Sequence, residues 1–464
     1  MKTNKFILSI IITTVLFFSS CESSLEIDPR QSEDATISLS TEAGISNILT
    51  GAYAIVANGD TYGGRILTSA ELLGVTGVTA TTDFRWRGTF NDCRQFYNKS
   101  ILVDNGFVQN IYTRSYEIIN ASNVVIENID KVKDPARRKI MIAEAMFLKS
   151  LVYFDLVRFF AKQYEFGQIN NQPGVVIRPK AIYDFSQNLA KQRSTVEEVY
   201  TLIVSGLNQA YTDLPANNSF YADKYAAKAL LARVYLQQEN YTEARNAAHE
   251  VITNSGHALS NNFAAAFNHE VDQIEDVFSV QITKQTGNNQ ATNLYASEGN
   301  GGRGGDIEIR NTYLNKFTDP ADQRRNFNYL NPDNNRRLTL KFSTEFGNVT
   351  ICRLAEMYLI RAETNFRLSS SLGNTPIDDI NLLRTRAVAN TLTTLNLNQI
   401  LSERELELGM EGFLIHDIKR TKSSIDASVP NLPKIIPYND NRLVFPIPLR
   451  EMDTNSLISQ NPGY

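Results

Sequence analysis

Residues 226–252 have the sequence AAKALLARVYLQQENYTEARNAAHEVI, and this stretch decides the fold. Its apolar residues recur three and four positions apart, which is the spacing of one face of an α-helix. The pattern predicts two helices placed back to back. Small residues such as Ala232, Ala244 and Ala248 recur along it and let paired helices approach closely.

The order of side-chain sizes in this stretch is similar to that of a tetratricopeptide helix pair. The large, small and aromatic positions are Leu231, Ala232 and Tyr235, followed by Tyr241, Ala244, Ala248 and Val251. Residues 358–383 resemble a degenerate second copy, and a third is expected within residues 140–214. Because such pairs stack into one core, we expect a mainly all-α, tetratricopeptide-like scaffold that forms one continuous domain over residues 41–464.

Two further helices are marked by their N-terminal signals. Asp134 and Pro135 are typical of an N-cap and of a first helical position, and an apolar stripe with helical spacing follows them. The sequence Ser194-Thr-Val-Glu197 predicts a capping box for the next helix, which is expected to end at Pro215.

Two stretches break the helical pattern. Residues 59–100 are rich in Gly and Thr, and residues 286–336 are crowded with Asn and Gly. Segments of this length inside a compact domain are usually functional or disordered. We therefore expect both to be long irregular loop insertions that are either functional or disordered.

The first residues have the pattern of a bacterial lipoprotein precursor. Residues 1–20 combine two lysines with a short apolar run, which is too short to span a bilayer and indicates a cleaved signal peptide. Ser19-Ser20-Cys21 is similar to a lipobox, so Cys21 is expected to carry acyl chains as a membrane anchor. The alternative is a secreted protein in which this cysteine is incidental. Residues 21–40 are polar and suit a lipidated flexible tether.

Charge and cysteine content exclude several classes of protein. The chain has 46 Lys and Arg against 50 Asp and Glu, a net charge of −4, which disfavours nucleic-acid binding because that needs clustered basic residues. Its three cysteines cannot form a disulfide framework or a four-cysteine metal site. The four histidines lack metal-ligand spacing, so we expect neither a metal ion nor a cofactor.

The sequence contains no convincing catalytic motif. Gly299 to Gly304 match GxGxxG, but no strand leads into them and we interpret them as a flexible loop. Glu403, Glu407 and Glu411 are four residues apart, and a glycosidase needs two carboxylates that face each other. Carboxylates on one helix face project the same way, so we interpret these as a salt-bridged helix face. The protein is not expected to be an enzyme.

Aromatic residues in the two irregular stretches are the candidate ligand-binding residues. A flat ring can stack on a sugar, while Arg, Asn and Asp side chains bond its hydroxyl groups. The candidates are Tyr62, Phe84, Arg85, Trp86, Arg87 and Asn91 in the first stretch, and Asn293, Tyr295, Arg303 and Asp306 in the second. The alternative is that Trp86 is a buried plug, in which case its replacement by Ala lowers stability instead of affinity.

Several segments, in order along the chain, together resemble the SusD/RagB family of outer-membrane nutrient-binding lipoproteins. They are IAEAMFLKSLVYFDLVRFF at 142–160, AAKALLARVY at 226–235, ILSERELELGMEG at 400–412, VFPIP at 444–448 and QNPGY at 460–464. The acidic Glu22 and Glu26 are similar to the surface-export signal of such lipoproteins.

This resemblance implies a lipid-anchored protein on the outer membrane that faces the cell exterior. It implies binding of a nutrient, usually an oligosaccharide, and its delivery to a SusC-like TonB-dependent transporter. Three alternatives stay open: a peptide-binding member of the family, a surface glycoside hydrolase and a structural helical-repeat adaptor.

Overall fold

The structure is a computed structural model that describes residues 39–75, 82–184, 186–426 and 435–464. The predicted signal peptide, Cys21 and nearly all of the predicted tether lie outside these ranges. Within the described ranges, no helix is long and apolar enough to cross a membrane.

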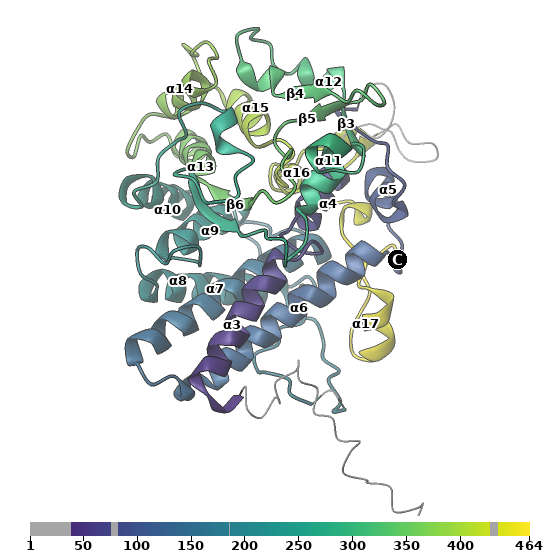
Figure 1. The fold of residues 1–464 in the computed structure, drawn as a ribbon, viewed down its shortest axis with the longest axis vertical. Coiled ribbons are helices and arrows are strands. Elements are labelled where there is room, and N and C mark those ends of the chain that lie inside the picture. The colour runs from purple at the N-terminus through teal and green to yellow at the C-terminus, as the bar shows by residue number, and fades with distance from the viewer. Residues whose placement is uncertain (1–38, 76–81, 185, 427–434) are drawn as a thin grey trace, which may run out of the picture.

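About half of the described chain is helical and little of it is sheet, which confirms the predicted mainly all-α fold (Figure 1). The α-helices are α3 Glu42–Ala57, α4 Arg65–Gly74, α5 Asn91–Asn98, α6 Gly106–Glu127, α7 Pro135–Phe160, α8 Val196–Asp213, α9 Lys224–Gln237, α10 Tyr241–Asn254, α11 Gln290–Tyr295, α12 Asn311–Leu314, α13 Leu354–Arg367, α14 Pro376–Arg386, α15 Leu397–Leu408, α16 Leu414–Arg420 and α17 Leu449–Thr454. Short 3-10 turns are η2 Ile129–Lys131, η3 Ala264–Ala266, η4 Glu298–Asn300, η5 Gln323–Asn326 and η6 Asn441–Leu443.

The strands are short and pair only in twos. They are β1 Phe84–Trp86, β2 Asp276–Val280, β3 Ile307–Ile309, β4 Asn328–Leu330, β5 Arg337–Thr339, β6 Val349–Arg353, β7 Ile425–Asp426 and β8 Ile435–Ile436. The antiparallel pairs are β1 with β3, β2 with β6, β4 with β5 and β7 with β8.

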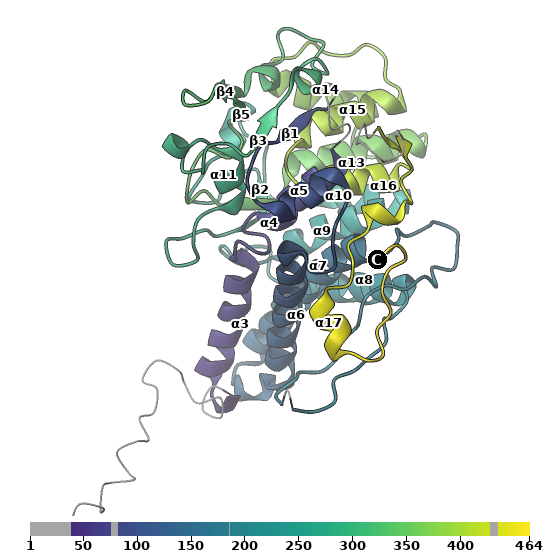
Figure 2. The same ribbon diagram turned by 90° about the vertical axis from the view of Figure 1, so that its right-hand side faces the viewer.

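The helices stack in sequence order. Helix α7 packs on α8, α8 on α9, α9 on α10, α10 on α13, and α13 on α14. The long helices α3, α6 and α7 form one half of the molecule, and the short strands and α11 to α15 form the other (Figure 2). The predicted helix pair over residues 226–252 is therefore α9 and α10, and Ala232, Ala244 and Ala248 are completely buried there.

The capping box before α8 begins one residue later than predicted. The Thr195 hydroxyl accepts the Glu198 N–H at 3.1 Å, and the Glu198 carboxylate accepts the Thr195 N–H at 2.8 Å. Ser194 instead donates its backbone N–H to Val175. The predicted helix start at Asp134 and Pro135 is confirmed, because the Asp134 carboxylate accepts the Ala136 N–H.

The two stretches predicted to be irregular contain more regular structure than expected. Residues 59–100 include α4, β1 and α5, and residues 286–336 include α11, α12, β3 and β4. Strands β1 and β3 pair, with Trp86 opposite Ile307 and Arg85 opposite Glu308. Pairing satisfies the backbone groups of both segments, so the two stretches hold each other in place.

The C-terminal segment packs into the aromatic core. The Phe445 ring stacks on Phe159 with centroids 4.6 Å apart. The Asn461 side-chain amide donates to the carbonyls of Phe160 and Phe445 at 2.8 and 2.7 Å. The Tyr464 hydroxyl donates to the Val444 carbonyl. The VFPIP and QNPGY sequences thus fasten the chain end to α7.

A buried ion network centred on Arg353 joins distant segments. Its guanidinium donates to Glu275 before β2 at 3.1 Å, to Glu407 on α15 at 2.7 Å and to Glu411 at 2.7 Å. Arg386 at the end of α14 binds both Glu275 and Glu407. The Glu407 side chain has no solvent exposure.

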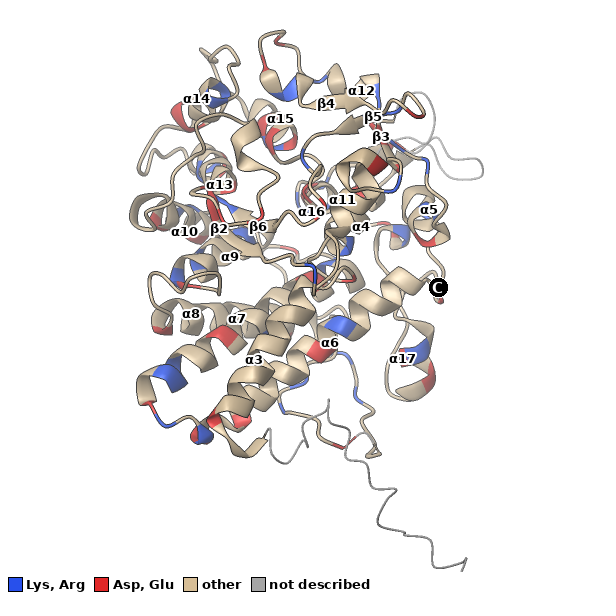
Figure 3. Ribbon diagram, viewed as in Figure 1, with Lys and Arg blue, Asp and Glu red and all other residues tan. Residues whose placement is uncertain are grey.

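Arg324 extends the same network to a 3-10 turn. It binds Asp322 at 2.7 Å, Glu403 at 2.6 Å and Glu407 at 3.2 Å. Acidic and basic residues lie together on α15 (Figure 3). The predicted ion pairing of Glu403, Glu407 and Glu411 is confirmed, but the prediction that all three share one helix face is wrong, because α15 ends at Leu408. Their partners come from other segments, and Glu403 and Glu407 are buried.

We predict that Glu407→Ala lowers the free energy of unfolding by about 3–5 kcal/mol, because it removes a buried carboxylate that Arg324, Arg353 and Arg386 all bind. Chemical denaturation followed by far-UV circular dichroism measures this loss. Glu405→Ala, two residues away, is the matched control. Its ion pair is partly exposed, so its loss should be about 1 kcal/mol or less. Equal losses in both variants would contradict the central role of the network.

Candidate functional site

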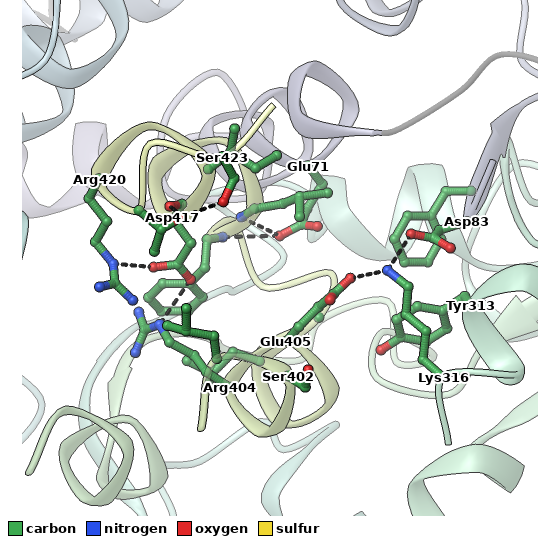
Figure 4. A pocket seen from close by; sticks show the side chains of 18 of the residues that line it. Glu71, Asp83, Tyr313, Lys316, Ser402, Arg404, Glu405, Asp417, Arg420 and Ser423 are labelled. Carbon is green, nitrogen blue, oxygen red and sulfur yellow. Dashed lines mark hydrogen bonds and ion pairs between the residues drawn. The ribbon is translucent and has the colours of Figure 1, made fainter. Parts of the chain in front are cut away.

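A cavity of about 340 Å³ opens where the two predicted ligand stretches meet the C-terminal half of the chain (Figure 4). Its walls come from α4, β1, α12, α15 and α16. The volume lies at the lower end of the range for small-molecule sites. Polar and apolar side chains both line it, so it can offer hydrogen bonds as well as apolar contact.

One wall joins the two stretches directly. The Lys316 ammonium donates to Asp83 at 2.6 Å and to Glu405 at 2.5 Å. The Phe84 ring lies 4.8 Å from the Tyr313 ring, centroid to centroid. Burial lowers the pKa of Lys316, but the two carboxylates outweigh it and raise the pKa overall. This wall is therefore a charged triad beside an aromatic pair.

Helix α15 forms a second wall that sequence reasoning missed. Asn398, Ser402 and Glu405 line the cavity, whereas Glu403 and Glu407 point into the ion network. The signal was present in the sequence, since positions 398, 402 and 405 are polar at helical spacing on one face. From its sequence we interpret this helix only as a salt-bridged face, whereas the structure shows that another of its faces lines the cavity.

A third wall consists of a fixed acidic group. The Asp417 carboxylate lies between Arg404, at 2.8 Å, and Arg420, at 2.6 Å (Figure 4). Burial raises the pKa of Asp417, but these two guanidinium groups outweigh it and hold the pKa below its usual value. Asp417 is thus an ionised, immobile acceptor.

The Glu71 carboxylate holds the start of α16 in place. It accepts the backbone N–H groups of Gly412, Phe413 and Leu414 at 2.8, 3.0 and 3.4 Å. Burial raises its pKa from 4.5 to about 7. Gly412 adopts a φ of +89°, and a Cβ there would lie 2.9 Å from Leu67 Cα, so this close approach requires glycine.

Four predicted aromatic ligand residues are buried and cannot serve as exposed platforms. Trp86 is 7% exposed and Phe84 only 2%, because both point inward from β1. Tyr62 packs against α7, where its hydroxyl donates to Asp155 at 2.5 Å and to the Leu151 carbonyl. Tyr295 stacks on Phe342 with centroids 5.3 Å apart. The expectation of an exposed Trp86 ring is wrong, and the plug interpretation describes it.

Most of the polar candidates lie nearer the surface, but Asp306 is buried. Arg85, Arg87 and Asn91 are exposed, and Asn293 is half-buried with its amide donating to Gln290. Arg303 pairs with Asp306 at 3.1 Å and its guanidinium covers the Phe90 ring. The structure thus brings both predicted stretches together, but of the ten predicted ligand residues only Phe84 lines the cavity.

A second, larger cavity of about 540 Å³ lies between α6, residues 176–182 and α17. Tyr112 and Tyr116 form an aromatic pair on its floor, with centroids 4.7 Å apart. None of the ten predicted ligand residues lines it.

The described residues contain no group of three or more His, Cys, Asp or Glu side chains that could hold a metal ion. Cys93 and Cys352 are both buried and unpaired in the part of the chain that is described.

Comparisons with known proteins match almost the whole chain. A family model described as "Starch-binding associating with outer membrane" matches residues 25–236, and a model described as "SusD family" matches residues 261–464. SusD-like protein P2 of Formosa agariphila is 26% identical over 91% of this chain and 93% of its own length.

Solved structures share the fold. A SusD superfamily protein from Bacteroides thetaiotaomicron has a TM-score of 0.80 at 24% identity, covering 91% of this chain and 100% of its own. A putative sugar binding protein from Bacteroides vulgatus has a TM-score of 0.81 at 23% identity, covering 92% of this chain and 99% of its own.

We predict that Trp86→Ala lowers the free energy of unfolding by about 3–5 kcal/mol, as expected for a large aromatic ring removed from a core. Thermal or urea denaturation measures this. Arg85→Ala, next to it on the exposed side of β1, should change stability by less than about 1 kcal/mol. A stable Trp86→Ala variant would contradict the burial of this ring.

We predict that the unfolding free energy depends on pH differently in wild type and in Glu71→Gln. A raised pKa in the folded state means that the stabilising contribution of Glu71 is complete below pH 4.5 and is lost as pH rises through about 7. Between these values, the unfolding free energy of wild type should therefore fall relative to that of the variant, which does not titrate. Urea denaturation at pH 4.5, 6 and 8 tests this, and parallel pH profiles would refute it.

Proposed function

Because the chain belongs to the SusD/RagB family, we propose that it binds a nutrient glycan in the cavity of Figure 4 and performs no reaction on it. The observation that carries this proposal is where the cavity lies. Glu71, Asp83 and Phe84 come from the first matched segment, and Tyr313 and the α15 and α16 walls come from the second. The site thus depends on the whole family fold.

The chemistry of the walls suits a sugar. Ser402, Asn398 and Lys316 supply donors, and Asp83, Glu405 and Asp417 supply acceptors for hydroxyl groups. Leu401 and Phe413 supply apolar surface for the face of a sugar ring. The charged groups among them are held by ion pairs, so ordering Lys316, Asp83, Glu405 and Asp417 costs little on binding.

The carboxylates of the cavity favour binding over hydrolysis. A glycosidase needs one carboxylic acid to donate a proton and a second carboxylate on the other side of the bond. Asp83 and Glu405 share Lys316, and Asp417 is fixed between two guanidinium groups. Glu71 is occupied by three backbone N–H groups. Each of these carboxylates already has a structural partner.

We also propose that Cys21 is lipidated and anchors the protein to the exterior of the outer membrane. In this proposal a SusC-like TonB-dependent transporter takes the ligand from it. Support comes from the lipobox-like sequence, and from the outer-membrane association in the description of the matching family model.

We predict that Ser402→Trp weakens glycan binding at least 10-fold while the protein stays folded. Ser402 is exposed on α15 and lines the cavity, so an indole there fills the space of the ligand. Native affinity electrophoresis against a panel of plant, fungal and host polysaccharides identifies the ligand, and calorimetry with the best oligosaccharide measures the change. Ser205→Trp, on an exposed position of α8, is the matched control.

Three other outcomes would revise the proposal. Loss of binding in Thr113→Trp but not in Ser402→Trp would move the site to the second cavity. Binding of oligopeptides but of no glycan would favour a peptide-binding member of the family. Release of reducing ends would indicate a glycoside hydrolase.

A further inference from the structure

The outer face of the β1–β3 ribbon carries a cluster of three arginines. Arg85 lies directly opposite Glu308 in the ribbon. The Glu308 carboxylate accepts a hydrogen bond from Arg87 Nε at 2.6 Å and another from Arg310 Nη1 at 3.2 Å. Three guanidinium groups therefore surround one carboxylate.

The net charge of this cluster is positive, whereas the net charge of the chain is negative. The chain has a net charge of −4, whereas the cluster has three positive charges and one negative charge. Burial raises the pKa of Glu308, but Arg87 and Arg310 outweigh it and lower the pKa overall, so this carboxylate stays ionised. A local excess of positive charge remains.

The three guanidinium groups share one environment. Burial raises the pKa of Tyr97 on α5, whereas Thr82 and the charges of Arg85, Arg310 and Arg87 lower it. The same phenol is thus in electrostatic reach of all three arginines. Because side chains alternate along a strand, Arg85 and Arg87 lie on the same side of the ribbon as Glu308 and Arg310.

Many of their N–H groups have no acceptor among the residues that the structure describes. Arg87 uses only Nε on Glu308, which leaves its two terminal nitrogens, and its side chain is 33% exposed. Arg310 has a 31% exposed side chain and uses one terminal nitrogen. Arg85 is exposed and forms no hydrogen bond or ion pair with any residue that the structure describes.

In the interior, Arg353 and Arg324 are fully engaged in ion pairs. Arg353 and Arg324 each bind three carboxylates in the interior. The ribbon arginines differ because the single carboxylate of Glu308 cannot accept hydrogen bonds from all of their N–H groups. A planar guanidinium fork with free N–H groups matches the oxygens of a carboxylate or a sulfate ester.

The cluster adjoins the cavity. Asp83 and Phe84 line the cavity, and Arg85 is the next residue of the same strand. The Arg310 N–H donates to the Asp83 carbonyl at 2.8 Å, so β3 brings its arginine to the same edge. Arg85, Arg87 and Arg310 do not line the cavity themselves, so a ligand would reach them by extending from the cavity along the ribbon.

We propose that Arg85, Arg87 and Arg310 form a subsite for an acidic group of the glycan, a uronate carboxylate or a sulfate ester. This inference rests on the proposed function and specifies its ligand class as anionic polysaccharides. Glu308 positions the guanidinium groups of Arg87 and Arg310. Both of its oxygens already accept N–H groups, so it repels an acidic group of the ligand only where that group approaches it directly.

The test measures binding of the full chain by calorimetry at low and at moderate salt. The probes are an oligouronate with its carboxyl-reduced form and a sulfated oligosaccharide with its desulfated form. We expect at least one acidic probe to bind 10-fold tighter than its neutral form, with affinity that falls as salt rises. Whichever acidic probe binds more tightly than its own neutral form, the oligouronate or the sulfated oligosaccharide, identifies the acidic group.

Variants locate the effect. Arg85→Gln should reduce binding of the acidic probe at least 5-fold without changing the melting temperature, since no described residue forms a hydrogen bond or ion pair with Arg85. Arg87→Gln should do the same. Arg137→Gln, on a 51% exposed arginine of α7, is the control and should bind as wild type does.

Equal affinity for the acidic and neutral forms, unchanged in Arg85→Gln, would overturn this inference and leave the proposed function standing. Failure to bind any glycan, acidic or neutral, would overturn both.

Discussion

The structure depends on the neutralisation of buried arginines, above all Arg353. Three carboxylates from different parts of the chain, Glu275, Glu407 and Glu411, bind its guanidinium. Removing two opposite charges from water costs several kcal/mol per ion, and good geometry is needed to recover that cost. The network therefore tolerates few arrangements of the segments that carry its members. This is what fixes α15 against β6 and α14, which apolar contacts alone would hold less specifically.

The position of α15 in turn determines the candidate site. One face of the helix places Glu403 and Glu407 in the ion network, and the other places Ser402 and Glu405 at the cavity. Rigid binding groups lose little entropy when a ligand orders them. The buried ion pairs of α15 thus make the helix rigid, and this rigidity holds Ser402 and Glu405 in place at the cavity. A substitution in the network should affect ligand binding through stability, whereas a substitution at Ser402 should affect it directly.

The sequence was sufficient for the scaffold but not for the surfaces of the site. The helix pair at 226–252 was predictable because its spacing and its alanines are local signals. The capping box was misplaced by one residue because Ser194 with Glu197 and Thr195 with Glu198 both match the pattern. The choice depends on Val175, whose carbonyl accepts the Ser194 N–H. The burial of Trp86 depends on β1 pairing with β3, more than 200 positions away in sequence, and no local pattern encodes that.

The arginines of this protein separate into two groups by what surrounds them. Arg324 and Arg353 are enclosed by carboxylates and have a structural role that no ligand can share. Arg85 and Arg87 are exposed on a two-stranded ribbon, where hydrogen bonding to the single carboxylate of Glu308 is incomplete. Water satisfies exposed guanidinium groups at little cost, so stability alone does not require them to converge. A binding surface for acidic groups requires arginines gathered beside a polar cavity, and this ribbon provides them. We therefore expect this surface to distinguish ligands by their charge.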